Sequence, residues 1–147
     1  MDFHLAQLNL ARARYALDDP RMAEFMDNLN RINDLGKASP GFIWILEDSS
    51  GNATGIHAFD DPSILINLTV WESLESLRNF AYKSDHVEFV RRRHEWFETK
   101  TPYLALWWVP AGKIPSVQDS KERLEHLMNN GPTPYAFNFI KNYPPET

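Results

Sequence analysis

The sequence predicts an α+β fold built on a β-α-β-β-α-β core. Apolar runs of strand length alternate along the chain with stretches whose apolar residues recur at helical spacing, and turn-forming residues separate the two kinds of segment. The length of 147 residues suits one domain with one hydrophobic core. We expect a single domain over residues 1–147, with its core over residues 3–110 and an added C-terminal helix and short strand over residues 113–140.

A strand and an amphipathic helix begin the core. Residues 3–10, FHLAQLNL, alternate loosely between apolar and polar side chains, as a half-buried strand does. Asp19 can cap the helix that follows, and Pro20 suits the first helical position after this cap. Gly36 is the expected end of this helix. The apolar residues of the helix fall on one stripe: Met22, Phe25, Met26, Leu29, Ile32 and Leu35.

A β-hairpin is expected next. The mostly apolar run FIWILED, residues 42–48, follows the turn former Pro40-Gly41 and predicts a second strand. Residues 49–62, SSGNATGIHAFDDP, are rich in turn formers and predict the hairpin loop. Residues 63–71, SILINLTVW, then predict the third strand, which ends at the corner Trp71-Glu72.

The second half of the core contains two predicted helices and a strand. Helical segments are expected over residues 73–82, with Ser73 as the cap, and over roughly residues 85–97. Residues 103–109, YLALWWV, predict the fourth strand. The resulting order is that of a ferredoxin-like core with one extra helix in the second crossover.

A helix and a short strand are expected after the core. PSVQDSKERLEHLMNNG predicts a final helix, because Ser116 and Asp119 are spaced as a variant of the capping box and Gly131 suits the end of the helix. AFNF, residues 136–139, predicts one short strand at an edge of the sheet.

The fourth strand predicts a homodimer, because it has two apolar faces. Leu104, Leu106 and Trp108 lie on one face, and Ala105, Trp107 and Val109 are among those on the other. A strand that is apolar on both faces is buried on both. Helices of the core cover one face of the sheet, and a second sheet paired across a two-fold axis could cover the other. A monomer with a shallow open face is the alternative.

The composition excludes several classes of function. The chain has 15 basic and 20 acidic residues and a net charge of −5, which argues against a surface for nucleic acid or anionic lipid. Without cysteine it has no disulfide and no thiolate metal site. The N-terminal residues lack the basic and then apolar layout of a signal peptide, and no stretch is long enough to span a bilayer. We therefore expect a cytoplasmic protein.

Polar side chains on the first and third strands predict a binding site. Alternation places Gln7 and Asn9 on one face of the first strand, and Asn67, Thr69 and Trp71 on one face of the third. These two strands are neighbours in this topology, so the polar groups could share a face. Buried amides and hydroxyls must be paired, so the cluster is satisfied internally, exposed at a strand end, or completed by water or a ligand. The ligand alternative is an apolar pocket with a few orienting donors.

Two histidines are candidates for proton transfer. His94 falls on the predicted apolar stripe of its helix and is expected to face the cleft, and His86 lies near the start of that helix. The alternative for both is a packed or surface position. No two of the five histidines have the close spacing of metal ligands, so no metal site is expected. Trp71 is interpreted mainly as a core residue that seats the next helix, with ligand contact as the alternative.

Several motifs carry a family resemblance. TVWESLESLRNF followed by SDHVEF resembles the strand-to-helix signature of the dimeric α/β-barrel superfamily, which includes antibiotic-biosynthesis and haem-degrading monooxygenases. FHLAQLNLARA, GFIWILED, HVEFVRRRHEWF, WWVPAGKIPS and GPTPYAFNF together resemble the bacterial domain-of-unknown-function family 3291 nearly end to end. The superfamily resemblance covers about residues 3–110. It implies a fold, dimerisation, and a ligand cleft between the sheet and the helices.

The resemblance also suggests roles for residues. Haem-degrading relatives use an asparagine late on the first strand, near Asn9, and a tryptophan on the helix after the third strand, where this chain has Phe80. The resemblance thus implies a cofactor-independent, monooxygenase-like oxidoreductase acting on an aromatic or other apolar substrate. The alternative is a non-catalytic binding protein for a hydrophobic or haem-like ligand. The candidate catalytic residues are His94 and Asn9. The candidate ligand-binding residues are Gln7, Asn67, Thr69, Trp71, Phe80 and His86.

Overall fold

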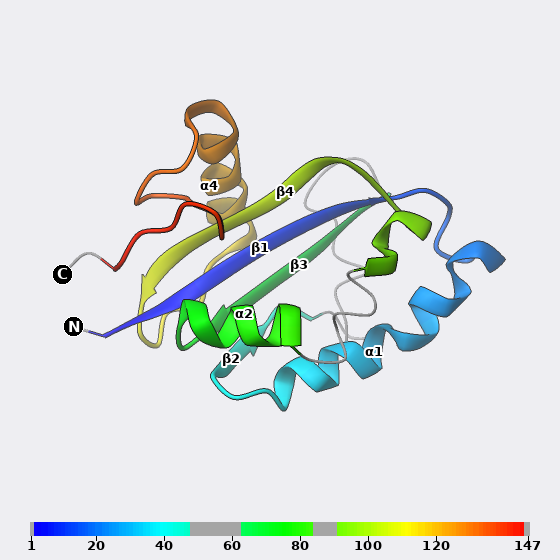
Figure 1. Cartoon of the computed structure of the whole chain (residues 1–147), viewed down its shortest axis with the longest axis horizontal. Coiled ribbons are helices and arrows are strands. Elements are labelled where there is room, and N and C mark those ends of the chain that lie inside the picture. Colours follow the sequence, from blue (N-terminus) through cyan, green and yellow to red (C-terminus); the bar gives the residue numbers. More distant parts are fainter. Residues whose placement is uncertain (1, 48–62, 84–90, 146–147) are drawn as a thin grey trace.

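The computed structural model describes residues 2–47, 63–83 and 91–145, and it contains one antiparallel sheet with helices on both faces (Figure 1). The strand order is β2-β3-β1-β4, the order of the predicted ferredoxin-like core. The helices and strands have these bounds: β1 Phe3–Ala13, α1 Ala23–Lys37, β2 Phe42–Ile45, β3 Ile64–Trp71, α2 Leu74–Lys83, β4 Phe97–Pro110 and α4 Val117–Asn130. Within the described residues, no helix is both long enough and apolar enough to cross a membrane.

The central strand β1 pairs with β3 on one side and β4 on the other, both antiparallel. Its register sets Gln7 opposite Thr69 and Asn9 opposite Asn67 on β3. Because successive side chains alternate between faces, these four residues share one face of the sheet. The prediction that the polar residues of the two strands lie together is therefore confirmed.

Helix α1 begins as predicted but ends later. Asp19 accepts a hydrogen bond from the backbone N–H of Arg21 at the start of a 3-10 turn, Pro20–Met22, which leads into α1. The hydrogen bond from the Arg21 side chain is the main reason that the pKa of Asp19 falls to about 2. The expected end at Gly36 is wrong, because α1 continues to Lys37. A Cβ atom on Gly36 would lie 3.4 Å from Phe80 Cζ, so this glycine permits close packing rather than ending the helix.

The helix predicted over residues 85–97 is wrong at its C-terminal end. Residues 84–90 lie outside the described residues. Arg93–Glu95 form a 3-10 turn, and Phe97 already begins β4 and pairs with Ala13 of β1. Trp96 and Phe97 are both buried among residues of β1, β3 and α1. The free energy gained by burying these two side chains and pairing the strand is larger than the helix propensity of this segment.

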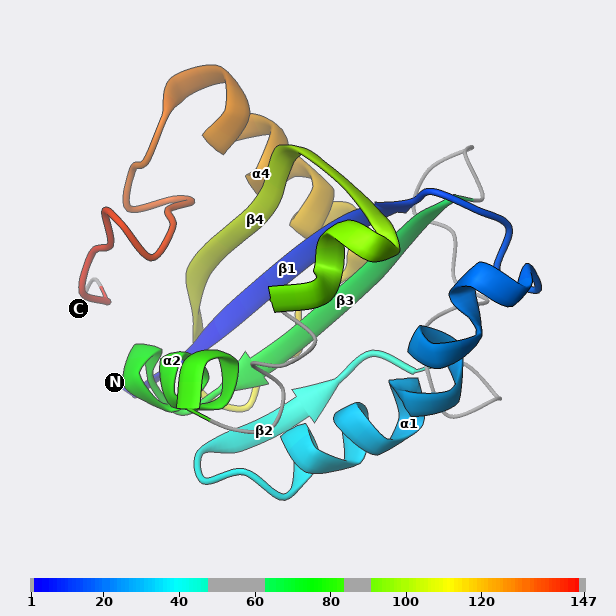
Figure 2. The ribbon, with the colours of Figure 1, turned by 45° about the vertical axis from the view of Figure 1, so that its right-hand side comes forward.

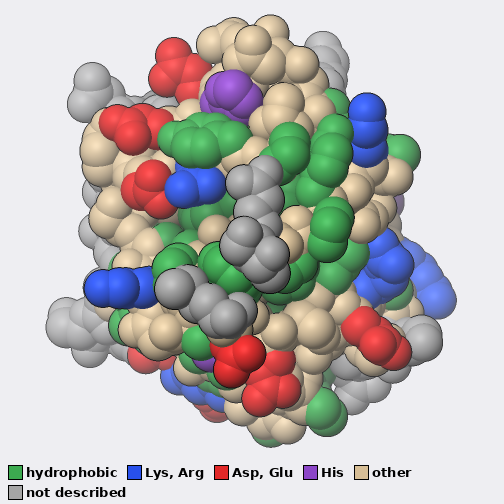
Figure 3. Space-filling view, turned by 90° about the vertical axis from the view of Figure 1, so that its left-hand side faces the viewer, with side chains coloured by type: hydrophobic (Ala, Val, Ile, Leu, Met, Phe, Trp, Pro, Cys, Tyr) green, Lys and Arg blue, Asp and Glu red, His purple; other side chains and the backbone are tan. Residues whose placement is uncertain are grey.

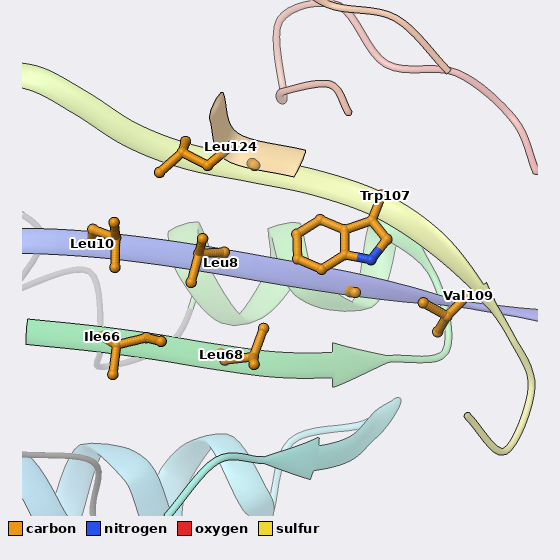
Figure 4. Packing of buried hydrophobic residues seen from close by; sticks show 9 residues of the cluster. Leu8, Leu10, Ile66, Leu68, Trp107, Val109 and Leu124 are labelled. Carbon is orange, nitrogen blue, oxygen red and sulfur yellow. The ribbon is translucent and has the colours of Figure 1, made fainter. Parts of the chain in front are cut away.

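Helix α4 lies on the sheet face opposite α1 and α2. Leu124 of α4 packs with Leu8, Leu68 and Trp107, which are buried side chains of three different strands (Figure 4). One chain therefore covers the face that led to the prediction of a homodimer. The homodimer stays a prediction, but the two apolar faces of β4 no longer require it.

The segment after α4 covers the free edge of β4. Phe137 exchanges two backbone hydrogen bonds of 2.8 Å with Leu106, which form an isolated bridge in place of the predicted strand over residues 136–139. Trp108 Nε1 donates a 2.7 Å hydrogen bond to the carbonyl oxygen of Tyr143. Hydrophobic side chains gather on the side of the molecule that carries both termini (Figure 3). The C-terminal segment thus shields a strand edge that would otherwise be open to pairing.

Gly41, which precedes β2, is expected to tolerate no side chain. Its φ is +84°, and a Cβ atom would overlap Ser76 Oγ and lie 2.5 Å from Ser76 Cβ on α2. We expect Gly41→Ala to lower the free energy of unfolding by about 2–4 kcal/mol, because backbone strain adds to the steric overlap. Urea unfolding measures this loss.

Gly112 provides the matched control for Gly41. It has a similar φ of +90°, but a Cβ atom there would have no atom of the described residues within 4 Å. Gly112→Ala should therefore lower the free energy of unfolding only through backbone strain, by about 1 kcal/mol. Equal losses at the two positions would mean that α2 does not pack against Gly41 as closely as the structure shows.

Candidate functional site

A cavity of about 610 Å³ lies between the sheet and helices α1 and α2. In Figure 2, α2 lies in front of the sheet and α1 runs beside β2. The strands β1, β3 and β4 contribute the floor of the cavity, and the helices contribute much of its wall. Its position agrees with the cleft that the family resemblance implies.

The floor of the cavity carries the predicted polar cluster. Gln7, Asn9, Asn67 and Thr69 all line it. Gln7 and Thr69 are each only 5% exposed, whereas Asn9 is exposed and Asn67 is half-buried. The structure therefore brings the four candidates together, and it places the most deeply buried pair beside the aromatic end of the cavity.

Trp71, Thr69 and Gln7 are joined by a chain of hydrogen bonds, which we name the Trp71–Thr69–Gln7 relay. Trp71 Nε1 donates to Thr69 Oγ1 over 2.9 Å, and Thr69 Oγ1 donates to Gln7 Oε1 over 2.7 Å. An indole nitrogen can only donate, so Thr69 accepts from Trp71, and the amide oxygen beside Thr69 Oγ1 accepts the hydroxyl proton. One predicted alternative, in which the buried polar groups form hydrogen bonds with one another, is thus correct for these three residues.

The two asparagines differ from the relay. Their side chains make no hydrogen bond with any part of the chain that the structure describes. Both line the cavity beside Gln7, so their amide groups are available to water or to a ligand. The floor thus combines one fixed amide with two that can rotate.

An aromatic cluster forms one end of the cavity. Trp71 is 1% exposed and stacks on Phe80 of α2, with ring centroids 5.3 Å apart and an interplanar angle of 24°. Phe42 of β2 meets Trp71 edge to face at 5.6 Å. Trp71 therefore seats α2 on the sheet, as predicted, and it also lines the cavity, as does Phe80. The two interpretations of Trp71 are compatible.

The C-terminal segment supplies a lining residue that sequence reasoning missed. Phe139 lines the cavity and contacts Tyr82 of α2 edge to face at 5.8 Å. The guanidinium of Arg78, also on α2, lies 5.7 Å from the Phe139 ring and donates to its carbonyl oxygen. No local pattern around Phe139 indicates this role, because it depends on where the segment crosses β4.

The opposite end of the cavity is formed by α1 and the start of β4. Phe25, Trp96 and Phe97 line it, and Phe25 contacts the rings of the other two at 5.7 and 4.9 Å. Phe25 belongs to the predicted stripe of α1, but Trp96 and Phe97 were assigned to a helix. Arg93 and Glu98 are the charged lining residues within the described part of the chain.

An ion-pair cluster ties this end of the cavity to α1. Arg92 donates to Glu24 of α1 over 2.5 Å and to Glu95 over 2.8 Å, and its guanidinium lies 4.9 Å from the Trp96 ring. The hydrogen bonds from Arg92 lower the pKa of both carboxyl groups. Both groups are exposed, so the cluster contributes orientation more than stability.

Of the two predicted histidines, the structure describes only His94, and it does not bring this side chain to the cavity. His94 is exposed on the 3-10 turn Arg93–Glu95 and does not line the cavity, so its expected orientation toward the cleft is wrong. The reason is that the helix from which its phase was taken has already ended. His86 lies outside the described residues. Among the residues that the structure does describe, no three His, Asp or Glu side chains are placed to hold a metal ion.

The fold is similar to that of several solved structures. A protein of unknown function, NE2512 from Nitrosomonas europaea, is 14% identical with a TM-score of 0.51, over 78% of this chain and 96% of that chain. A conserved protein from Methanosarcina mazei Go1 is 17% identical with a TM-score of 0.50, over 71% and 91% of the two chains. SnoaB, a cofactor-independent oxygenase from Streptomyces nogalater, is 16% identical with a TM-score of 0.50, over 77% and 98%. At such identities the likeness shows the fold alone.

The sequence itself identifies the family. No curated protein matches the sequence. The profile of one family, described as Domain of unknown function (DUF3291), matches residues 4–147. The resemblance to this family that was drawn from the sequence motifs is therefore confirmed over nearly the whole chain. The chain belongs to the DUF3291 family.

Proposed function

We propose that the protein binds an aromatic or other apolar small molecule in the cavity between the sheet and helices α1 and α2. The observation that carries this proposal is the pairing of an amide floor with aromatic ends in a cavity of about 610 Å³. Small-molecule sites typically have this construction, with mostly apolar walls and a few polar groups that fix orientation. A flat ring system can pack against Phe42 and Phe80 while its polar group meets the floor.

The proposed reaction is a cofactor-independent, monooxygenase-like oxidation of the bound molecule. The likeness to SnoaB supports it by analogy of fold. For a phenol such as naphthol, the substrate and O2 would give the quinone and water, so the substrate itself supplies all the electrons. Amide donors of Gln7, Asn9 and Asn67 would stabilise the phenolate oxygen that forms when the substrate loses its proton. Glu98 carries the one carboxylate among the described residues that line the cavity, and its Oε2 atom lies 3.7 Å from Nε of Arg12.

The second candidate is a non-catalytic binding protein. The position of His94 outside the cavity favours it, because the predicted general base is not beside the bound molecule. Haem is a poor fit to the described lining residues, because the one side chain among them of a type that ligates haem iron is Tyr82, which is 52% exposed and packs edge to face on Phe139. A hydrophobic organic ligand fits them better.

Thermal unfolding with naphthol tests binding, and an oxygen electrode tests reaction. We expect naphthol to raise the melting temperature of the wild-type protein, and haem to produce no shifted Soret band. Leu29→Trp, which fills the cavity from α1, should abolish the shift, whereas Asp27→Trp on the exposed side of the same helix should keep it. Oxygen uptake with naphthol and no added cofactor supports the enzyme. Binding without uptake supports the second candidate, and no melting shift contradicts both.

A further inference from the structure

Gln7 is the most deeply buried amide of the cavity floor. It lies on the central strand β1, opposite Thr69 of β3 and Leu106 of β4. It is 5% exposed and lines the cavity. Any ligand that reaches the floor beside the aromatic end meets this amide, and an apolar group placed against it would remove the hydrogen bonds that water can supply.

The Trp71–Thr69–Gln7 relay determines which end of the amide is free. The amide is turned so that its oxygen, Oε1, lies 2.7 Å from Thr69 Oγ1 and accepts the hydroxyl proton, while Thr69 accepts from the indole N–H of Trp71 through a lone pair. The oxygen of the amide is therefore occupied. Within the described residues Gln7 Nε2 has no hydrogen-bond partner, so two N–H donors remain for a bound molecule.

Asn9 and Asn67 lack such a constraint. No hydrogen bond to the described residues holds either side chain, so each amide can present its oxygen or its nitrogen. Selection between donor and acceptor groups on a ligand therefore rests on Gln7.

From this arrangement we infer that Gln7 selects ligands with a carbonyl oxygen on an otherwise apolar ring system, and that Thr69 and Trp71 are positioning residues for its amide. This inference rests on the proposed function, because it concerns the same cavity. It adds the chemical group that the ligand presents to the floor: an acceptor rather than a donor. A carbonyl oxygen has two lone pairs, so it can accept one N–H of Gln7 Nε2 and a second from Asn67.

Three small probes of similar shape test the inference: α-tetralone, tetralin, and an aminotetralin with its uncharged amine on the aromatic ring. They present a carbonyl acceptor, no polar group, and a donor, respectively. We expect Gln7→Met to weaken α-tetralone binding about tenfold and to change tetralin binding less than about twofold, measured by calorimetric titration. Gln118→Met on α4, far from the cavity lining, is the matched control and should change neither affinity.

Thr69 variants test positioning separately from packing. Thr69→Val keeps the shape but frees the amide to rotate, so the preference for α-tetralone over the aminotetralin should fall to within about twofold. Thr69→Ser retains the hydroxyl and should restore the preference. A purely structural role for Thr69 predicts equal loss for all three probes, which contradicts the inference.

The possible failures are distinguishable. If no probe binds the wild-type protein, both the proposed function and this inference are overturned. If the probes bind but Gln7→Met weakens α-tetralone and tetralin equally, the cavity is a binding site and Gln7 does not select the carbonyl. A shift of the Gln7 side-chain amide signal by α-tetralone, and not by tetralin, in nuclear magnetic resonance spectra supports the inference directly.

Discussion

Trp71→Ala is expected to lower the free energy of unfolding by about 3–5 kcal/mol. The side chain is 1% exposed, stacks on Phe80 and meets Phe42 edge to face. Its removal leaves a void between the sheet and α2, and it deprives Thr69 of a hydrogen-bond donor. Urea unfolding followed by far-ultraviolet circular dichroism measures the loss.

A milder substitution separates packing from hydrogen bonding at this position. Trp71→Phe keeps an aromatic ring but removes the N–H group that donates to Thr69, and we expect a loss of about 1–2 kcal/mol. Trp44→Phe makes the same chemical change on the opposite face of the sheet, where the tryptophan is half-buried, and should cost less than about 1 kcal/mol. Equal losses for the two tryptophans would contradict a special role for the Trp71 corner.

Leu124→Ala on α4 is expected to lower the free energy of unfolding by about 2–5 kcal/mol. Leu124 is 4% exposed and packs with Leu8, Leu68 and Trp107 across three strands. If α4 covers this face of the sheet in solution, shortening the side chain leaves a cavity in the second half of the core. Chemical unfolding of the variant and the wild type gives the difference.

Met128→Ala is the matched control on the same helix, because Met128 is 57% exposed and should contribute less than about 0.5 kcal/mol. Sedimentation of the wild-type protein belongs to the same experiment. If Leu124→Ala costs nothing and the wild type sediments as a dimer, a second copy, rather than α4, covers the face. Loss of stability for Leu124→Ala and not for Met128→Ala is the result that the structure predicts, whether the wild type sediments as a monomer or as a dimer.

Local periodicity accounts for the success of the prediction at the cavity floor. A strand has two faces, so alternation alone groups Gln7 with Asn9 and Asn67 with Thr69. The order of elements then makes β1 and β3 neighbours, and their pairing follows. No distant information is needed for either step, and the relay partner Trp71 follows from the same alternation.

The errors share a different cause, which is contact between parts of the chain that are distant in sequence. The prediction that His94 faces the cavity depends on a helix that continues to residue 97. In the structure Phe97 already belongs to β4, where it pairs with Ala13. Phe139 reaches the cavity because Phe137, two residues earlier, bridges to Leu106. The periodicity of apolar residues in a helix or a strand does not indicate which distant segments of the chain come into contact.

Four features of this protein follow from its sequence alone: the ferredoxin-like core, the family, the shared polar face of β1 and β3, and the corner at Trp71. These features depend on local pattern and on the order of elements. Three other features depend on the folded chain: α4 covers the second face of the sheet, the described lining of the cavity contains no histidine, and Gln7 has its amide oxygen occupied and its nitrogen free. The physical reason is that burial and hydrogen bonding between distant segments choose among arrangements that the local pattern permits equally.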